Sequence, residues 1–553
     1  MKIMKRVLFA ISLIAAGVVS GETGVPSSGA RVLTADARFL MLPVKNGAPV
    51  VKARVLVGDS VFRTFDIPFA PDAPDWYAAL DIASVKGASL TVAVDGASAD
   101  ALARVKTAAE APVPDGYDGT YRPQFHFSPQ RGWNNDPNGL SWYDGEWHLF
   151  FQHNPYGVKW GNMHWGHAVS SDLLHWRELG DVLAPDATLG AMFSGSAVID
   201  RDNTAGFGKG AHVLIFTGTA NGSAQSLAYS LDGRNYVKWS GNPVLPCVTP
   251  DNRDPRVFWH APSHRWVLAL YVKENGRHNV VIFNSPDLKA WTRAGTIPGD
   301  MDGKGRFLYE CPELFELPVS GETTCSRWIV FGANGEYAVG IFDGRTFTPE
   351  ERRIPMNRGF VGYYAAQTFG DAPDGRRILL PWFRVGMPGM PFNQMMGLPR
   401  ELGLVRTPNG LRLRQSPVKE IESLRDGPAK ALGDFEGDLA EVSLDVRPAP
   451  SARIVFSLRG IRVVYDAARE LLEIPGGTTS WPLENGRFRA RMFIDRAGME
   501  TFSTDGLVCL PSVTLADPGN LKLSIVEGAD RILDDRSSAC RLKRVWNNGG
   551  DVK

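Results

Sequence analysis

Short runs of alternating apolar and polar residues make up much of the chain, and a first group of them lies near the N-terminus. Segments 54–57, 61–65 and 89–94 follow this pattern, with turn-forming residues between them. A period of two is typical of strands that bury one face. The pattern predicts a small antiparallel β domain at residues 28–106. The stretch 107–120, in which Pro, Gly and Asp recur, is typical of a linker.

A turn of one type recurs four times in the middle of the chain, as an aspartate followed a few residues later by an aromatic residue. The aspartates are Asp172, Asp232, Asp287 and Asp343, so successive turns are 60, 55 and 56 residues apart. A repeat of this length with room for about four strands is typical of one propeller blade. Residues 121–415 accommodate five such blades. A β-sandwich is the alternative, but it would leave the similar spacings to coincidence.

The alternating pattern returns near the C-terminus, in segments such as 454–458, 489–494 and 521–526. It predicts a β-sandwich at residues 420–546. The chain as a whole is therefore expected to be all-β. A five-bladed β-propeller would form the catalytic domain, with this C-terminal β-sandwich and a small N-terminal β accessory domain.

The first residues have the pattern of a secretory signal peptide, expected at residues 1–21. Three basic residues precede an uncharged, mostly apolar run at 7–19, and two small residues follow it. The run is shorter than the roughly 20 residues of a membrane-spanning helix. The first cysteine is Cys247, so no cysteine is placed for a lipid anchor. We expect a periplasmic or extracellular protein without a membrane anchor.

Composition narrows the function. Sixty Lys and Arg balance 60 Asp and Glu, so net charge provides no attraction to nucleic acid or to anionic membranes. Five cysteines are too few for a disulfide-rich scaffold, and whether Cys509 and Cys540 pair stays open. No phosphate-binding or dinucleotide-binding glycine motif occurs in a suitable context, so no cofactor is expected. Composition does not predict the oligomeric state.

Three acidic residues occupy matched positions in three different repeats. Asp136, Asp254 and Glu310 lie 36, 33 and 33 residues before the turn aspartate of their own repeat. Because blades are arranged radially, equivalent positions on inner strands converge on the propeller axis. Converging carboxylates raise one another's pKa, and a protonated acid beside an ionised one is what glycoside cleavage requires. A lone Asp-Pro would instead be typical of a turn cap.

Aromatic and amide side chains gather in the first repeat, as expected for a ligand rich in hydroxyl groups. They are Trp133, Asn135, Gln152, Asn154, Trp160 and Trp165. About half of the tryptophans in this region are expected to pack between blades instead. His164 and His167 have the spacing of a metal pair, but no third ligand is evident, so we expect no metal site. Cys311 is expected to pack or to tune its neighbours rather than to act as a nucleophile.

Eight ordered motifs resemble glycoside hydrolase family 32, the invertase, inulinase and levanase family. They are FHFSP at 125–129, WNNDPNG at 133–139, FFQHNP at 150–155, WGHA at 165–168, FSGS at 193–196, RDP at 253–255, ECP at 310–312 and LPREL at 398–402. The resemblance implies a five-bladed propeller followed by a sandwich, in which FIDR at 493–496 would lie.

The resemblance also implies roles for the three acids. Asp136 would be the nucleophile of a retaining mechanism, and Glu310 the general acid and base. Asp254 would hold fructose hydroxyls and stabilise the transition state. The family positions that line the fructose pocket are matched by Asn135, Gln152, Trp160, Ser194 and Arg253. The implied partner is a fructan or a fructo-oligosaccharide.

Our first hypothesis is a secreted exo-acting fructan β-fructosidase that cleaves levan or inulin. An invertase-like sucrose hydrolase, an endo-levanase or a fructosyltransferase would carry the same catalytic residues. A fructan-binding propeller without activity is the alternative of another class, and the intact Asp136 and Glu310 argue against it. One position departs from the family pattern: Phe392 stands where a tryptophan is often found, which puts the far wall of the pocket in question. The accessory domain is similar to one that precedes some bacterial fructan hydrolases.

Overall fold

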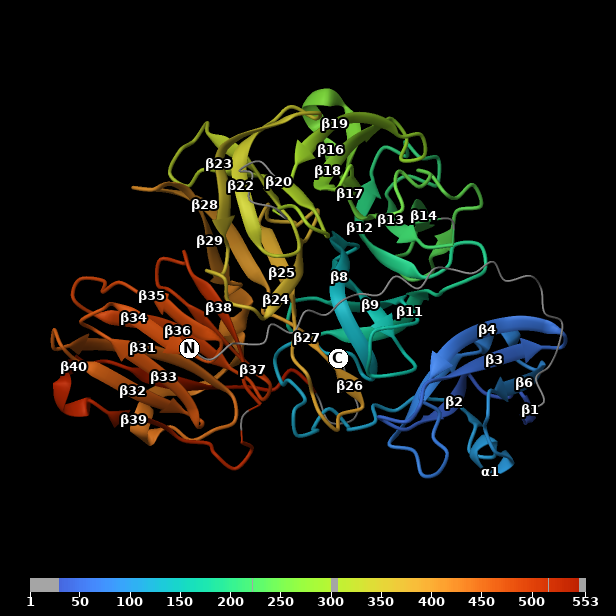
Figure 1. Cartoon of the computed structure of the whole chain (residues 1–553), viewed down its shortest axis with the longest axis horizontal. Helices are drawn as coiled ribbons and strands as arrows, with labels where there is room; N and C mark the ends of the chain where they lie inside the picture. The colour runs from blue at the N-terminus through green and yellow to red at the C-terminus, as the bar shows by residue number, and fades with distance from the viewer. Residues whose placement is uncertain (1–28, 221, 300–306, 516, 547–553) are drawn as a thin grey trace.

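The computed structural model describes residues 29–220, 222–299, 307–515 and 517–546, and nearly all of its elements are strands. Figure 1 shows a small module of β1–β7, a central propeller and a C-terminal sandwich. The predicted all-β class is confirmed. The predicted signal segment 1–21 lies outside the described residues. Among the described residues, no helix is long and apolar enough to cross a membrane.

The N-terminal module consists of two facing sheets around one apolar core. The first contains, in spatial order, β1 (Ala30–Thr34), β6 (Ser89–Val94), β3 (Val51–Val57) and β4 (Ser60–Ile67). The second contains β5 (Trp76–Asp81), β2 (Phe39–Val44) and β7 (Lys106–Ala108), and the short helices are η1 (Ala83–Val85) and α1 (Ala99–Leu102). Strand β7 thus includes the first two residues of the stretch predicted as a linker.

The propeller contains five sheets arranged around a common axis (Figure 1). The first blade contains β8 (Gly132–Tyr143), β9 (Glu146–Asn154), β10 (His164–Ser170) and β11 (Arg177–Leu183). The second contains β12 (Met192–Asp200), β13 (Ala211–Gly218), β14 (Ala224–Ser230) and β15 (Val237–Lys238). The third contains β16 (Asn252–His260), β17 (Arg265–Glu274), β18 (Arg277–Ser285) and β19 (Thr292–Pro298), with η2 (Ala261–Ser263) after β16.

The last two blades complete the ring. The fourth contains β20 (Glu313–Pro318), β21 (Ser326–Phe331), β22 (Glu336–Phe342) and β23 (Phe347–Pro355). The fifth contains β24 (Tyr363–Thr368), β25 (Arg377–Phe383), β28 (Arg400–Thr407) and β29 (Gly410–Pro417), with β27 (Met395–Met396) beside β25. The short strand β26 (Phe392–Asn393) leaves the fifth blade and pairs in parallel with β8. This pairing links the last blade to the first and closes the propeller.

The four repeated turns each connect the third strand of a blade to the fourth. In the first blade, the Asp172 carboxylate accepts hydrogen bonds from the backbone N–H groups of Leu174 and His175. The other three turn aspartates accept two backbone N–H groups each in the same way. These are Asx-turns, in which the carboxylate replaces a backbone acceptor. The spacing that predicted the propeller therefore reflects one local structure repeated in four blades.

The C-terminal module is a two-sheet sandwich with its own apolar core. One sheet contains β30 (Arg425–Ala431), β41 (Ser538–Leu542), β31 (Ala440–Pro448), β36 (Phe488–Ile494), β37 (Gly498–Phe502) and β38 (Cys509–Val513), with β40 (Ile532–Asp535) beside β31. The other contains β35 (Gly477–Ser480), β34 (Leu471–Ile474), β33 (Ile461–Asp466), β32 (Arg453–Leu458) and β39 (Leu523–Glu527). The short helices are η3 (Lys419–Leu424), η4 (Leu432–Asp434) and η5 (Ala529–Arg531).

The sandwich is fastened to the propeller by a buried carboxylate. Asp495 accepts hydrogen bonds from the backbone N–H groups of Gln124 and Phe125, and its Oδ2 lies 2.9 Å from His126 Nδ1. The predicted linker is also packed: the ring of Tyr117 stacks on Trp546 with centroids 4.6 Å apart. Connections of this kind fix the outer modules against the propeller.

Candidate active site

One residue from each blade reaches the propeller axis at the same end of the molecule. Four of the five inner strands carry a β-bulge there, where extra residues re-aim a side chain. In the fourth blade, Glu310 and Cys311 precede β20 and both have positive φ angles. The five residues, in blade order, are Asp136, Ser194, Asp254, Glu310 and Tyr364. We call this group the axial site.

Asp136 is held by neutral donors. Ser194 Oγ donates a 2.7 Å hydrogen bond to its Oδ2, and Asn135 Nδ2 donates one of 3.1 Å to Oδ1. The Asn135 amide is oriented in turn by the indole N–H of Trp133, at 2.9 Å. The Cys311 thiol lies 3.4 Å from Asp136 Oδ2. Because these groups donate without bringing positive charge, they orient the carboxylate and leave its charge uncompensated.

Glu310 has a cationic and a phenolic partner. Arg253 Nη2 donates to its Oε1 at 2.6 Å, and the Tyr364 hydroxyl donates to Oε2 at 2.5 Å. Arg253 itself lies over the ring of Tyr271, with its Cζ 4.8 Å from the centroid, and also pairs with Asp251. These contacts leave Arg253 little freedom, so both carboxyl oxygens of Glu310 are fixed in place.

Asp254 is almost fully buried and shares the Cys311 thiol with Asp136. Its Oδ2 accepts the backbone N–H of Cys311 at 3.0 Å and lies 3.5 Å from the thiol. Its own backbone N–H is held by Thr217 Oγ1 at 3.1 Å. The φ angle of Asp254 is +62°, a conformation uncommon for a residue other than glycine. Such strain is often found at functional sites.

Burial and charge act together on the acids. Burial raises the pKa of Asp254 to about 7, with Asp136 and Glu310 adding repulsion and Arg253 opposing both. Burial also raises the pKa of Asp136, whereas the hydrogen bonds from Ser194 and Asn135 lower it. The pKa of the Cys311 thiol lies well above its usual range because it is buried among these carboxylates. Burial beside these carboxylates therefore favours the neutral form of the Cys311 thiol.

The remaining residues predicted for the pocket lie around this group. Trp160 is 59% exposed, and its ring meets that of Phe193, the neighbour of Ser194, at 6.0 Å. Gln152 is buried on β9 and donates to the Met192 carbonyl at 2.9 Å, two residues before Ser194. The structure thus places Trp160 at the rim and Gln152 beneath it.

The structure gives partners to two residues singled out in the sequence. Asn154 is grouped with the amides suited to a sugar, and its Nδ2 donates to the Lys159 carbonyl in the loop that follows β9. Phe392, where the chain departs from the family pattern, is fully buried with the guanidinium of Arg122 3.5 Å from its ring centroid. The half-buried Trp382 lies nearer the acids, since its ring meets that of Tyr364 at 6.1 Å.

Sequence reasoning missed Tyr364 and Trp382. Tyr364 occupies in the fifth blade the place that the acids occupy in theirs. The repeat phase does not point to it, because the turn between β28 and β29 begins at residue 408, 44 residues after Tyr364, and contains no aspartate. The histidine pair has structural roles: His167 Nε2 lies 3.0 Å from His148 Nδ1, and His164 contacts the Asn162 carbonyl. Among the described residues, no group of three or more His, Cys, Asp or Glu is arranged to hold a metal ion. Cys509 and Cys540 are free thiols.

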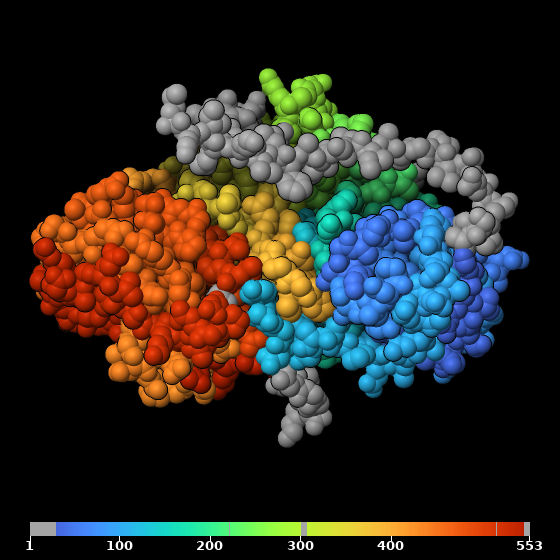
Figure 2. Space-filling view, turned by 60° about the horizontal axis from the view of Figure 1, so that its bottom comes forward, coloured from blue at the N-terminus to red at the C-terminus, as the bar shows by residue number. Residues whose placement is uncertain are grey.

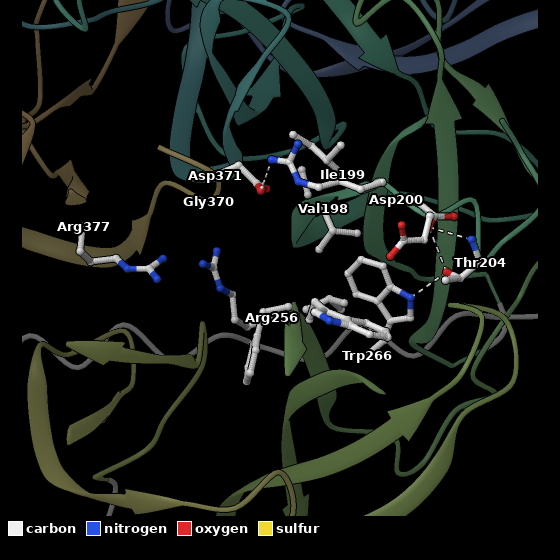
Figure 3. A pocket seen from close by; sticks show the side chains of 15 residues that line it. Val198, Ile199, Asp200, Thr204, Arg256, Trp266, Gly370, Asp371 and Arg377 are labelled. Carbon is white, nitrogen blue, oxygen red and sulfur yellow. Dashed lines mark hydrogen bonds and ion pairs between the residues drawn. The ribbon is translucent and has the colours of Figure 1, made fainter. Parts of the chain in front are cut away.

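A separate hollow of about 300 Å³ opens at the opposite ends of the inner strands (Figure 3). Figure 3 shows Arg256 and Arg377 pointing into it, with Asp200 and Trp266 on another side. Two of the carboxylates there have partners: Asp200 accepts from the backbone N–H of Thr204 at 2.8 Å, and Asp371 accepts from Arg201 at 2.7 Å. The hollow has no converging unpaired acids, so the axial site is the better candidate for chemistry.

Three carboxylates lie on the axis of the propeller, and one of them is held by a guanidinium and a phenol. Carboxylates grouped in this way are the catalytic groups that glycoside hydrolases use. The family model described as the glycosyl hydrolases family 32 N-terminal domain matches residues 126–417, more than half of the chain. The chain belongs to glycoside hydrolase family 32, as the motifs predicted, and is a glycoside hydrolase.

Similar proteins agree with this assignment. The levanase of Bacillus subtilis (strain 168) is 36% identical over 490 residues, which cover 78% of this chain and 72% of the levanase. An extracellular exo-inulinase of Aspergillus ficuum is 35% identical over 523 residues, covering 78% of this chain and 96% of the inulinase. Among solved structures, an exo-inulinase from Aspergillus awamori superposes with a TM-score of 0.68 at 27% identity, covering 78% of this chain and all of that one.

Proposed function

We propose that this protein is a secreted β-fructofuranosidase that removes terminal fructosyl units from levan or inulin, and also from sucrose. The observation that carries the proposal is the convergence of Asp136, Asp254 and Glu310 on one axis. Its relatives named levanase and exo-inulinase support the substrate class. The predicted signal segment, together with relatives described as extracellular, supports secretion to the periplasm or the medium.

The first half of the reaction forms a covalent intermediate. Asp136 attacks C2 of the terminal fructosyl unit, while Glu310 donates its proton to the glycosidic oxygen, which leaves with the bonding electron pair. Asp136 suits attack because Ser194 and Asn135 orient it without neutralising it. Glu310 suits proton transfer because Arg253 and Tyr364 hold both of its oxygens. The mechanism requires the two carboxyl groups to lie about 5–5.5 Å apart in the substrate complex.

The second half releases fructose. Glu310, now ionised, takes a proton from water, and the resulting oxygen attacks C2 and frees Asp136. Asp254 accepts hydrogen bonds from two fructose hydroxyls and stabilises the positive charge that develops at the ring. Trp160 stacks on the sugar at the rim. Asn135, Gln152, Ser194 and Arg253 complete the pocket.

The test is chromatography of products over time from the purified protein with levan, inulin and sucrose. Fructose as the sole early product from a polymer supports the proposal, and the faster polymer names the preferred linkage. Early oligosaccharides would replace it with an endo-acting enzyme. The absence of any product from all three substrates would refute it.

A further inference from the structure

The N-terminal module contacts the propeller at the loop that carries Trp160. This loop, residues 155–163, connects β9 to β10 and is called the rim loop here. Figure 2 shows the blue N-terminal module lying against the propeller. Strand β4 of the module and Pro68, which follows it, face the rim loop directly.

The contacts are specific and involve both ends of the rim loop. The ring of Phe65 stacks on that of Tyr156 with centroids 3.9 Å apart and planes 12° from parallel. Tyr156 is buried and belongs to the apolar core of the N-terminal module. At the other end, Asn162 Oδ1 accepts the backbone N–H of Asp66 at 2.9 Å, and its Nδ2 donates to the Asp66 carbonyl at 2.7 Å. Asn162 thus pairs with β4 as another strand would.

The module leaves the loop little room. A Cβ built at Gly157 would lie 3.3 Å from Cδ of Pro68, so the backbone of the rim loop lies close to the Pro68 ring of the module. Asn154 joins the loop internally, since its Oδ1 accepts from Asn162 Nδ2 at 3.0 Å and its Nδ2 donates to the Lys159 carbonyl at 2.8 Å. The position of the Trp160 backbone is therefore determined jointly by Asn154 of the propeller and by the contacts of the loop with the N-terminal module.

We propose that the N-terminal module is a positioning element that holds the rim loop and so fixes Trp160 at the mouth of the axial site. This inference rests on the proposed function, in which Trp160 stacks on the substrate. The module acts through the loop and contributes no catalytic residue. Loss of its contacts with the loop should weaken substrate binding and leave the chemical step unchanged.

The test uses the full chain with Asn162→Gly, which removes both hydrogen bonds to Asp66, together with the one to Asn154, and tolerates the φ of +44° at this position. Phe65→Leu is a second variant, which removes the ring stack and keeps most of the volume. With a fructo-oligosaccharide, each should raise KM about 3- to 10-fold, the size expected for the loss of one aromatic pair or a few hydrogen bonds. The kcat should stay within about twofold.

A double-mutant cycle tests whether the effect passes through Trp160. In a Trp160→Ala background, Asn162→Gly and Phe65→Leu should raise KM no further. Equal increases in both backgrounds, or a fall in kcat at unchanged KM, would overturn the inference. Arg38→Ala, which breaks an exposed ion pair with Asp81 inside the module, is the matched control and should change neither constant.

Limited proteolysis gives a readout that does not depend on activity. Lys159 is exposed in the rim loop, next to Trp160. Trypsin should cut after Lys159 several times faster in Asn162→Gly and Phe65→Leu than in the wild type, and at the wild-type rate in Arg38→Ala. Equal cutting in all four proteins would refute the positioning role. A wild-type protein without activity on any fructan would refute the proposed function, whatever the proteolysis shows.

Discussion

The two ends of the propeller axis are built from the same inner strands but treat charge in opposite ways. At the axial site, the guanidinium of Arg253 pairs with Glu310 and lies 3.9 Å from Asp254, whereas Asp136 has only neutral donors. The hollow at the opposite ends of the inner strands is called the far hollow here. Beside it, Glu313 lies 3.4 Å from the lining residue Arg256 and accepts a 2.7 Å hydrogen bond from Thr368, and Asp371 of the lining pairs with Arg201. The axial site thus has more carboxylates than cationic partners, whereas Glu313 and Asp371 each have an arginine of their own.

This difference in carboxylate pairing distinguishes residues that serve activity from residues that serve stability. Unpaired buried carboxylates lower stability, so they are tolerated where their charge has a use. Beside the far hollow, contacts among Arg256, Thr368 and Glu313 connect three blades, because these residues belong to β16, β24 and β20. Substitutions at the axial site should therefore affect activity most, and those at the far hollow should affect stability.

The largest expected effect is the loss of activity in Asp136→Asn. An amide cannot form the glycosyl ester, so kcat should fall by about 10⁴-fold or more. Asp371→Asn at the far hollow is the matched control, and its kcat should stay within about twofold of wild type. Steady-state hydrolysis of sucrose or a fructo-oligosaccharide measures both. Activity retained in Asp136→Asn would contradict the assignment of catalysis to the axial site.

Stability should change in opposite directions at the two ends. Glu313→Gln leaves the buried Arg256 with its hydrogen bonds to Thr368 but without a carboxylate partner, and should lower the free energy of unfolding by about 3–5 kcal/mol. Asp254→Asn should raise that free energy at pH 8, because it removes a buried charge that the fold disfavours. Equilibrium denaturation at pH 8 compares them. Destabilisation by both substitutions would show that Asp254, too, serves the structure.

The pH dependence sharpens this contrast. The pKa of Asp254 is raised from its ordinary value of 3.8 to about 7 in the fold, so ionisation costs stability progressively between about pH 4 and pH 7. At about 1.4 kcal/mol per pKa unit, the cost above pH 7 amounts to a few kcal/mol. The advantage of Asp254→Asn over the wild type should therefore be absent near pH 4 and reach its maximum above pH 7. A pH-independent difference would contradict the assignment.

The smallest of these effects is expected for Tyr364→Phe. It removes the hydroxyl that donates to Glu310 and should lower kcat about tenfold, the loss of one hydrogen bond to a charged group. The loss should be smaller with fructosyl fluoride, whose leaving group depends less on protonation. Equal losses on sucrose and on the fluoride would show that Tyr364 does not act through Glu310.

The sequence predicted well those parts of the molecule that repeat. The spacing of Asp172 and its equivalents predicted the blades, because each forms the same Asx-turn with its own backbone. The matched phase of the three acids predicted that they converge, since blades place equivalent residues on one axis. Local hydrogen bonding and strand periodicity depend on residues that are close together in the chain, so they can be predicted from the sequence.

The parts that depend on contacts between distant segments were not predictable. Asn154 lies beside pocket residues in sequence, yet its partners are in its own loop, and that loop is braced by residues about 90 positions earlier. Phe392 stands where the family often has tryptophan, but β26 pairs with β8 and buries it. The surroundings of these residues depend on how distant segments pack together, which the hydrophobic periodicity of the sequence does not predict.

The central claim is that Asp136 forms a covalent bond to the sugar at the axial site. The most direct test is mass spectrometry of a Glu310→Gln variant incubated with fructosyl fluoride and digested with protease. The substitution slows hydrolysis of the covalent intermediate, because the variant enzyme lacks the base that activates water. We predict one fructosyl unit on the peptide that contains Asp136. An adduct on another peptide, or turnover with inverted configuration and no adduct, would contradict the account.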